Sequence, residues 1–334
     1  MSDAPPTPSL ESSSSGPRHF FVRFARPLLF VLGAIALVTL VWKIGALAVW
    51  HALVGAGGWL PLILLLDFSW IAIEGGAILI LYGGASRSIP RLAWLEATLV
   101  HYATFMVVPM GRASAEFARA GLMTKHVGKS RAAASALLMQ SFTLISNALL
   151  SLMCLAFVWL AARSVPLRGA IGLNVAITCI LGIATYLLLR HVKLGGFMGR
   201  TFSKLSNAGP EIDKQIAESR RRHLPALLVC FSGRTLQTVQ YGVIFLAVVG
   251  GVTMTDAFTA QGIQLVSRTL GDMVPNQVGV TETAFAAGAK ALGLQGHIDK
   301  AVAIALLARL SNLSMAGLCA LLVQLMPLLK NSRN

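Results

Sequence analysis

The chain has 334 residues, with 28 Lys and Arg against 13 Asp and Glu, so its net charge is +15. Hydrophobic residues make up 55% and charged residues 12% of the sequence, whereas a soluble domain carries about 25% charged residues. So much apolar side chain cannot be hidden in one water-soluble core, and the composition also excludes intrinsic disorder, collagen and small disulfide scaffolds. The composition indicates a polytopic membrane protein.

The N-terminal region differs from the rest of the chain. Residues 1–26 form a tail and basic flank, and the Ser/Pro-rich part, 1–17, is expected to be disordered. The first cations come late and the apolar run 27–50 is long, so we expect a permanent first helix and no cleaved signal. A membrane domain over 27–328 and a short tail over 329–334 are expected to follow.

Six apolar runs reach the roughly 20 residues that a membrane-spanning helix needs. They are 27–50, 59–82, 131–162, 170–190, 225–250 and 301–328.

Two further segments, 92–122 and 257–292, are interrupted at Pro109-Met110-Gly111 and at Pro275-Asn276-Gln277. Each is expected to form a helix–break–helix hairpin, either re-entrant or fully spanning. The sequence therefore predicts an all-α, polytopic integral membrane protein with about six spanning helices and two broken hairpins.

The connections between the runs carry very unequal numbers of cations. One side receives eighteen Lys and Arg residues, and the other side receives only Arg163, Arg168, Lys290 and Lys300. Because Lys and Arg concentrate in cytoplasmic connections, we expect a multi-pass protein of the bacterial inner membrane with both termini in the cytoplasm. The basic connection 191–224 is expected to be an amphipathic helix on the inner membrane surface or a solvated loop. Nucleic acid is not an expected partner.

The two broken segments resemble each other at a fixed offset. Val108-Pro109 and Glu116 recur 166 residues later as Val274-Pro275 and Glu282. The same offset also relates two pairs of apolar runs, namely 59–82 with 225–250, and 131–162 with 301–328. This pattern predicts an internal duplication.

Each half, 27–165 and 166–328, would cross the membrane an odd number of times, so the second half must be inverted relative to the first. Inverted repeats with discontinuous helices that meet near the membrane midplane are a recurring design of transporters. We therefore expect the tips of the two hairpins to approach each other in the middle of the bilayer.

Several charged residues lie at membrane depth, where each costs about 2.5–3.5 kcal/mol unless it is paired or hydrated. Arg112, Glu116 and Arg119 share one face of the second arm of the first hairpin. Arg268 and Asp272 are four residues apart and are expected to form an ion pair that holds the shape of the second hairpin. Supporting polar residues, which alternatively serve only as structural pairs, are Asp67, Glu74, His101, Arg234 and Arg309.

The breaks predict an anion site. A helix that begins near the membrane middle presents unpaired N–H groups and about half a positive charge, and arginines flank both breaks. Glu116 and Glu282 would balance charge, bind an amine or carry a proton. The candidate substrate-binding residues are Pro109, Gly111, Arg112, Glu116, Arg119, Arg268, Asp272, Pro275, Asn276 and Glu282.

Metal and cofactor motifs are missing from the sequence, and no cofactor is expected. The four cysteines lie inside apolar runs without a CxxC motif and are expected to be small buried hydrophobes. They are Cys154, Cys179, Cys230 and Cys319.

The two breaks also carry a family resemblance. The stretch from Pro109 to Arg119 resembles the P-x-R-x-G-E-x-x-R element of the lysylphosphatidylglycerol synthase transmembrane-region family, also called flippase-like membrane proteins. The stretch from Pro275 to Glu282 is similar to the second element of that family, P-x-x-x-G-x-x-E. The resemblance covers roughly 27–328, with Ala115 in a position where the family often has Gly.

The resemblance implies a stand-alone membrane module without the soluble aminoacyl-transfer domain, and hence no enzymatic activity. It implies translocation of a lipid or lipid-linked head group, with membrane lipids and an amphiphilic substrate as partners; a homo-oligomer is left open. The alternatives are a secondary transporter of a small anionic solute, an intramembrane transferase, which would normally show a metal-binding acidic pair, and a non-transporting assembly subunit.

Overall fold

A computed structural model of the chain describes residues 42, 46–108, 111–161, 164–191, 209–272, 274 and 277–331. The helices of the first half are α2 (Ala46–Ala56), η1 (Gly57–Trp59), α3 (Leu60–Tyr82), η2 (Gly83–Ser88), α4 (Arg91–Val107), α5 (Gly111–Val127) and α6 (Lys129–Leu160). They are followed by α7 (Val165–His191), α9 (Gly209–Glu218), η4 (Arg220–Arg222), α10 (His223–Val249), α11 (Met254–Gly271), α12 (Val280–Gly288) and α13 (Ile298–Asn331). No strand occurs among the described residues, which confirms the all-α class.

Four helical segments are long and apolar enough to cross a membrane, and a fifth span is possible. The four are Leu53–Ser88, Lys129–Leu160, Val165–His191 and Ile298–Met326. The segment Arg220–Val249 is long and apolar enough to cross a membrane only when it is taken together with Met254–Gly271, and the two segments are bent by 108° at the break between them. A polytopic membrane protein is therefore confirmed, with four to five candidate spans where the sequence predicts about six. Most of the predicted run 27–50 lies outside the described residues, as do the tails 1–26 and 332–334.

The surface and the interior are both typical of a protein in lipid. Leu181 and Leu188 on α7 and Leu321 on α13 are among the large apolar side chains that are exposed. Asp67 and Arg234, by contrast, are only 1% and 2% exposed. Apolar side chains thus face the surroundings while charges are kept inside, because an unpaired charge facing hydrocarbon is costly.

The helix boundaries follow the predicted duplication. Adding 166 to the bounds of α3 gives 226–248, which lies inside α10, and the same shift places α4 on 257–273, which overlaps α11. The shift moves α5 onto 277–293, which contains α12, and α6 onto 295–326, which overlaps α13. Four consecutive helices of the first half thus have counterparts in the second half.

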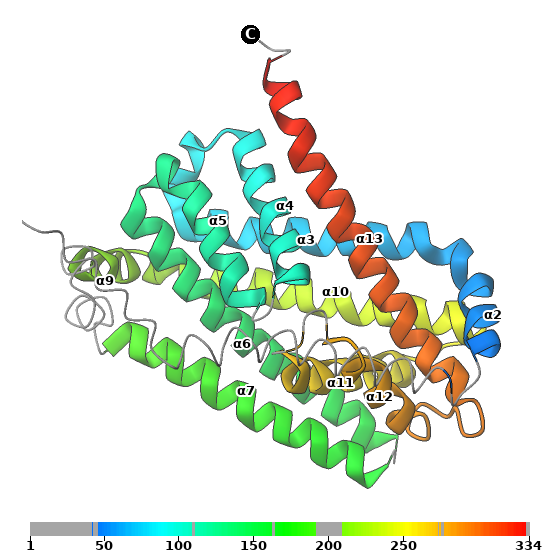
Figure 1. Cartoon of the computed structure of the whole chain (residues 1–334). Coiled ribbons are helices and arrows are strands. Elements are labelled where there is room, and N and C mark those ends of the chain that lie inside the picture. Colours follow the sequence, from blue (N-terminus) through cyan, green and yellow to red (C-terminus); the bar gives the residue numbers. More distant parts are fainter. Residues whose placement is uncertain are drawn as a thin grey trace, which may run out of the picture.

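The counterparts α3 and α10 run in opposite directions. Near one end of the pair, Arg222 donates a hydrogen bond to the backbone carbonyl of Leu81 (3.4 Å). Toward the other end, Ile63 and Ile244 belong to the same buried cluster. Figure 1 shows α3 and α10 side by side across the molecule. Equivalent helices that lie antiparallel are what an inverted repeat requires.

Each hairpin packs against the other half of the molecule. Helix α4 of the first hairpin contacts α13, and α11 of the second hairpin contacts α6 (Figure 1). This exchange of partners brings the two breaks toward the centre of the helical array.

The basic connection contains one amphipathic helix in its described part. Ile212 and Ile216 of α9 are buried where the helix packs on α6 and α7, while Lys214 and Glu218 are exposed. The amphipathic alternative is therefore correct for residues 209–218, and 192–208 lie outside the described residues. Of the cysteines, Cys154, Cys230 and Cys319 are buried as expected, whereas Cys179 is partly exposed.

Candidate functional site

The first break is closed by a close approach between the two arms of its hairpin. A Cβ atom on Gly111 would lie 2.1 Å from the backbone carbonyl oxygen of Phe105, so no side chain fits at this position. Gly111 therefore lets α5 begin directly against the end of α4, as the sequence indicates. Pro109 lies outside the described residues.

The second break is held at its backbone by a side chain from a neighbouring helix. Gln277 has a φ of +54°, which is uncommon for a residue other than Gly, and its carbonyl accepts a hydrogen bond from Arg309 of α13 (3.0 Å). Glu282 accepts a hydrogen bond from the backbone N–H of Gly279 (3.0 Å) and so caps the start of its own helix, α12. Pro275 and Asn276 lie outside the described residues.

Glu282 and Arg309 form a buried ion pair across α12 and α13. Their closest nitrogen and oxygen atoms are 2.8 Å apart, and the Glu282 side chain is fully buried. The pair joins the helix after the break to α13. One guanidinium nitrogen of Arg309, Nη1, is buried without a hydrogen-bond partner among the residues that the structure describes.

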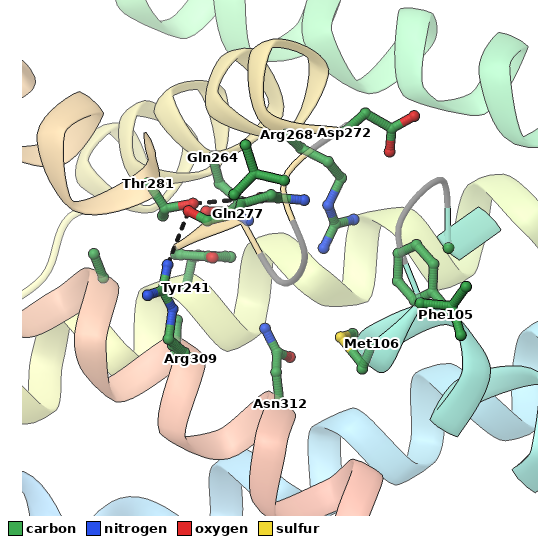
Figure 2. A pocket seen from close by; sticks show the side chains of 15 residues that line it. Phe105, Met106, Tyr241, Gln264, Arg268, Asp272, Gln277, Thr281, Arg309 and Asn312 are labelled. Carbon is green, nitrogen blue, oxygen red and sulfur yellow. Dashed lines mark hydrogen bonds between the residues drawn. The ribbon is translucent and has the colours of Figure 1, made fainter. Parts of the chain in front are cut away.

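A pocket lies between the two breaks. Figure 2 shows its walls, which come from both hairpins and from α10 and α13. It is lined by Phe105, Met106, Val108, Gly111, Tyr241, Gln264, Arg268, Asp272, Val274, Gln277, Thr281, Ala305, Ala308, Arg309 and Asn312. Residues of both breaks thus line one cavity, as the inverted repeat predicts.

Two arginines from opposite hairpins meet at one aromatic ring beside this pocket. The guanidinium carbon of Arg112 and that of Arg268 each lie 5.5 Å from the centre of the Phe105 ring. Within the described part of the chain, neither arginine has a carboxylate within 4.0 Å. Their contact with the ring is a cation–π interaction, and the carboxylates of Glu74 and Asp272 act on these charges only from beyond salt-bridge distance.

The expected ion pair between Arg268 and Asp272 does not form. Arg268 reaches toward Phe105, whereas the Asp272 side chain points away from it and is exposed (Figure 2). Asp272 is the C-cap residue of α11 and keeps helical backbone angles (φ −61°, ψ −23°), so the spacing still places both residues on one face, and the pair is lost because the Arg268 side chain turns to the Phe105 ring. Asp272 still lines the pocket at its edge.

Glu116 is the centre of a second buried cluster. It accepts a hydrogen bond from Arg119, three residues along α5, and its other oxygen lies 3.2 Å from Nε2 of His101 on α4. Glu116, Arg119 and His101 are 4%, 1% and 7% exposed. The expected stripe of three charges therefore divides, since Arg112 is near the pocket while the other two residues pair inside the hairpin.

The remaining supporting residues pair with side chains of neighbouring helices. Glu74 on α3 pairs with Arg234 on α10 (2.8 Å), and Arg234 also lies over the ring of Trp70 (5.2 Å). Asp67 accepts a hydrogen bond from Ser311 of α13. These contacts join helices of the two halves, as the structural alternative predicts. The described residues contain no group of three His, Cys, Asp or Glu that could hold a metal ion.

Sequence reasoning missed the aromatic and amide side chains of the pocket. Phe105, Tyr241, Gln264 and Asn312 line it, and in an apolar chain their types do not separate them from ordinary core residues. Tyr241 and Asn312 do carry a signal, because helical spacing places Tyr241 on one face with Arg234, and Asn312 on one face with Arg309.

Fold and site together define a class, that of polytopic helical membrane proteins with two broken hairpins around an internal cationic pocket. The sequence profile of the lysylphosphatidylglycerol synthase TM region matches residues 26–319, which is most of the chain, so the protein belongs to this family. The family is a membrane domain associated with flippase-like movement of lipids. No curated protein and no solved structure matches the chain.

Proposed function

We propose that the protein moves an amphiphile with a phosphate-bearing head group, a phospholipid or a lipid-linked carrier, from one leaflet of the membrane to the other. The observation that carries this proposal is the meeting of Arg112 and Arg268 at Phe105, where no carboxylate of the described residues lies within 4.0 Å of either arginine. Two unpaired guanidinium groups at membrane depth are costly unless an anion or water satisfies them.

The pocket suits a head group rather than a hydrocarbon chain. Arg268, Arg309, Gln264 and Asn312 present guanidinium and amide groups to it. Arginine is the preferred residue for recognising a phosphate, because its planar fork donates two parallel hydrogen bonds. Helix α5 also begins at this point, and the start of a helix favours an anion. The acyl chains would remain in the surrounding lipid.

The buried glutamates are proposed to balance charge. Glu282 and Glu116 each pair with an arginine and are buried, so they keep part of the cationic charge from competing for the substrate. Arg112 and Arg268 then remain as the groups that attract the head group. Pro109, Pro275 and Asn276 stay proposed as the residues that break the helices.

We further propose that the protein lies in the bacterial inner membrane with both termini in the cytoplasm, that it is not an enzyme, and that it binds no cofactor. The orientation is supported by the gathering of basic residues at one end of the structure, where Arg131 of α6 contacts Gln215 of α9 and Arg222 contacts α3.

The test is leaflet exchange in liposomes. The purified protein is reconstituted with fluorescent phosphatidylglycerol, and the rate at which the label becomes protected from external dithionite is measured. The variants Arg112→Gln and Arg268→Gln are expected to slow exchange by at least about tenfold, because each loses a charge-assisted hydrogen bond.

The matched control is Lys125→Gln, which removes an exposed cation at the other end of α5 and is expected to leave the rate unchanged. Equal rates for all variants at equal protein content would contradict the assignment. Uptake of a labelled soluble phosphate ester by wild-type liposomes without lipid exchange would favour a solute transporter instead.

A further inference from the structure

A second polar cavity lies at the end of the molecule where the basic connections gather. It is lined by the end of α3, by η2, by the first turns of α6, and by α9 and η4. We call it the interfacial pocket. The residues that matter for its chemistry are Tyr82, Arg131, Ser135, Gln215, Glu218 and Arg222.

Arg131 is oriented by a chain of hydrogen bonds. Its Nε donates to the side-chain oxygen of Gln215 (2.8 Å), and the amide nitrogen of Gln215 donates to Glu211 (3.0 Å). This chain fixes the guanidinium group at the pocket wall through one nitrogen. The other two nitrogens remain available, and no carboxylate of the described residues lies within 4.0 Å of Arg131.

Arg222 is oriented by the backbone of the loop after α3. Gly83, with a φ of +57°, lies so close to the guanidinium group that a Cβ atom there would be 2.1 Å from Cζ of Arg222. One terminal nitrogen of Arg222 donates to the carbonyl of Leu81 (3.4 Å). Because Gly83 has no side chain, the loop leaves room for the guanidinium group of Arg222. Arg222 therefore lies at the pocket, opposite the helix that carries Arg131.

The floor of the interfacial pocket leads toward the first hairpin. Tyr82 is fully buried, and its hydroxyl group has no hydrogen-bond partner in the described structure. Tyr82 also interacts electrostatically with Arg119 and Glu116. Nε and Nη1 of Arg119 are likewise buried without a partner. Tyr82 at the pocket and Arg119 in the first hairpin thus both carry buried polar atoms without a partner among the described residues.

We infer that the interfacial pocket binds a phosphate ester through Arg131 and Arg222, at the level of the lipid head groups. Two guanidinium groups on different elements that converge without a carboxylate partner form the usual recognition geometry for a phosphate. Ser135, which is buried, supplies a hydroxyl group from the same turn of α6 as Arg131. Glu218 is exposed at the rim, where it suits an ammonium or hydroxyl group next to the phosphate.

If the protein moves lipid, this pocket is the place where the head group leaves the leaflet before it reaches Arg112 and Arg268. That role rests on the proposed function, whereas the binding site itself does not. The two sources of a phosphate ester, a lipid and a soluble metabolite, are separated by the choice of probe.

The test is isothermal titration of the detergent-purified full chain with dihexanoylphosphatidylglycerol and, separately, with glycerol 1-phosphate. Both titrations use an Arg112→Gln background, so that binding between the hairpins does not contribute. Arg131→Gln and Arg222→Gln are each expected to weaken binding by at least about tenfold, since each loses charge-assisted hydrogen bonds. Arg131→Lys and Arg222→Lys keep the charge. Size-exclusion elution of all four variants shows that a loss of binding does not arise from misfolding.

The matched control is Arg220→Gln, two residues before Arg222, which removes an exposed cation outside the pocket and is expected to change binding by less than about twofold. Binding that is unchanged in Arg131→Gln and Arg222→Gln, or that is weakened equally by Arg220→Gln, would overturn the inference. Tighter binding of the lipid than of glycerol 1-phosphate supports a head group as the ligand, and equal binding supports a soluble phosphate ester.

The outcome is separable from that of the proposed function. Binding at Arg131 and Arg222 without any leaflet exchange by the wild-type protein would leave this site standing and remove translocation. Exchange that depends on Arg112 but not on Arg131 or Arg222, with no measurable binding at the interfacial pocket, would leave translocation standing and remove this site.

Discussion

The two hairpins place a glutamate at the same position but support it differently. Glu116 and Glu282 are 166 residues apart and follow equivalent breaks, and both are buried against an arginine. In the first hairpin the partners, Arg119 and His101, come from the hairpin itself. In the second hairpin the partner is Arg309 of α13, which also holds the carbonyl of the break.

This difference shows how one duplicated motif can acquire two mechanical roles. The ion pair of the second hairpin joins it to a long helix of the bundle, so that its break is fixed from outside. The ion pair of the first hairpin joins its own two arms, so that α4 and α5 are held to each other. We therefore expect the second hairpin to depend on Arg309 for its position and the first to depend on the contact at Gly111.

The largest effect is expected for Arg309→Leu. It leaves the carboxylate of Glu282, which is fully buried, without its cation, and breaking a buried pair in this way costs about 3–5 kcal/mol. Thermal unfolding of the detergent-purified protein, followed by tryptophan fluorescence, should show a clearly lowered Tm. The control Arg309→Lys keeps a cation and should lose less. An unchanged Tm for Arg309→Leu would show that the pair does not hold the second hairpin.

A smaller effect is expected for Gly111→Ala. The new methyl group would collide with the backbone carbonyl of Phe105, and overpacking of this kind costs about 1–3 kcal/mol. The displaced Phe105 ring should also slow lipid exchange. The matched variant is Gly121→Ala on the same helix, where a Cβ meets no atom within 4 Å and stability should stay equal or rise. The idea fails if both variants unfold at the same temperature.

The smallest effect is expected for His101→Gln. Glu116 keeps Arg119 as its partner and the amide can still donate a hydrogen bond, so the cost should be about 1 kcal/mol or less. The same unfolding assay tests this expectation. A loss as large as that of Arg309→Leu would mean that the two glutamates are supported equally, and the contrast between the hairpins would disappear.

The helices and the hairpins could be predicted from sequence because they depend on local signals. Length and apolarity mark α3, α6, α7 and α13, and the Val-Pro recurrence marks both breaks. The sequence predicts an independent span over 225–250. Helix α10, however, carries Arg234, Gln237 and Gln240, and its segment is apolar enough to cross a membrane only together with α11.

The partners of the charged residues could not be predicted, because they depend on tertiary packing. The spacing predicts that Arg268 pairs with Asp272, but Arg268 turns to a ring from the other hairpin. The partners of Glu282 and Glu74 are 27 and 160 residues away in sequence. No local pattern identifies such pairs.

The most direct test of the central claim, that hairpins from the two halves meet at one pocket, is a cross-link between their breaks. Val108 and Val274 both line the pocket, and each is replaced by Cys in a chain whose four native cysteines are replaced by Ala, with a protease site at 200–204 that cuts the chain into two parts, each with one hairpin. In native membranes, a short bifunctional maleimide should keep the two parts together after proteolysis. The control pair Leu187→Cys and Val274→Cys, in which Leu187 is an exposed residue of α7, should separate. Separation of the parts in the Val108 and Val274 pair, with both thiols shown to react, would contradict the account.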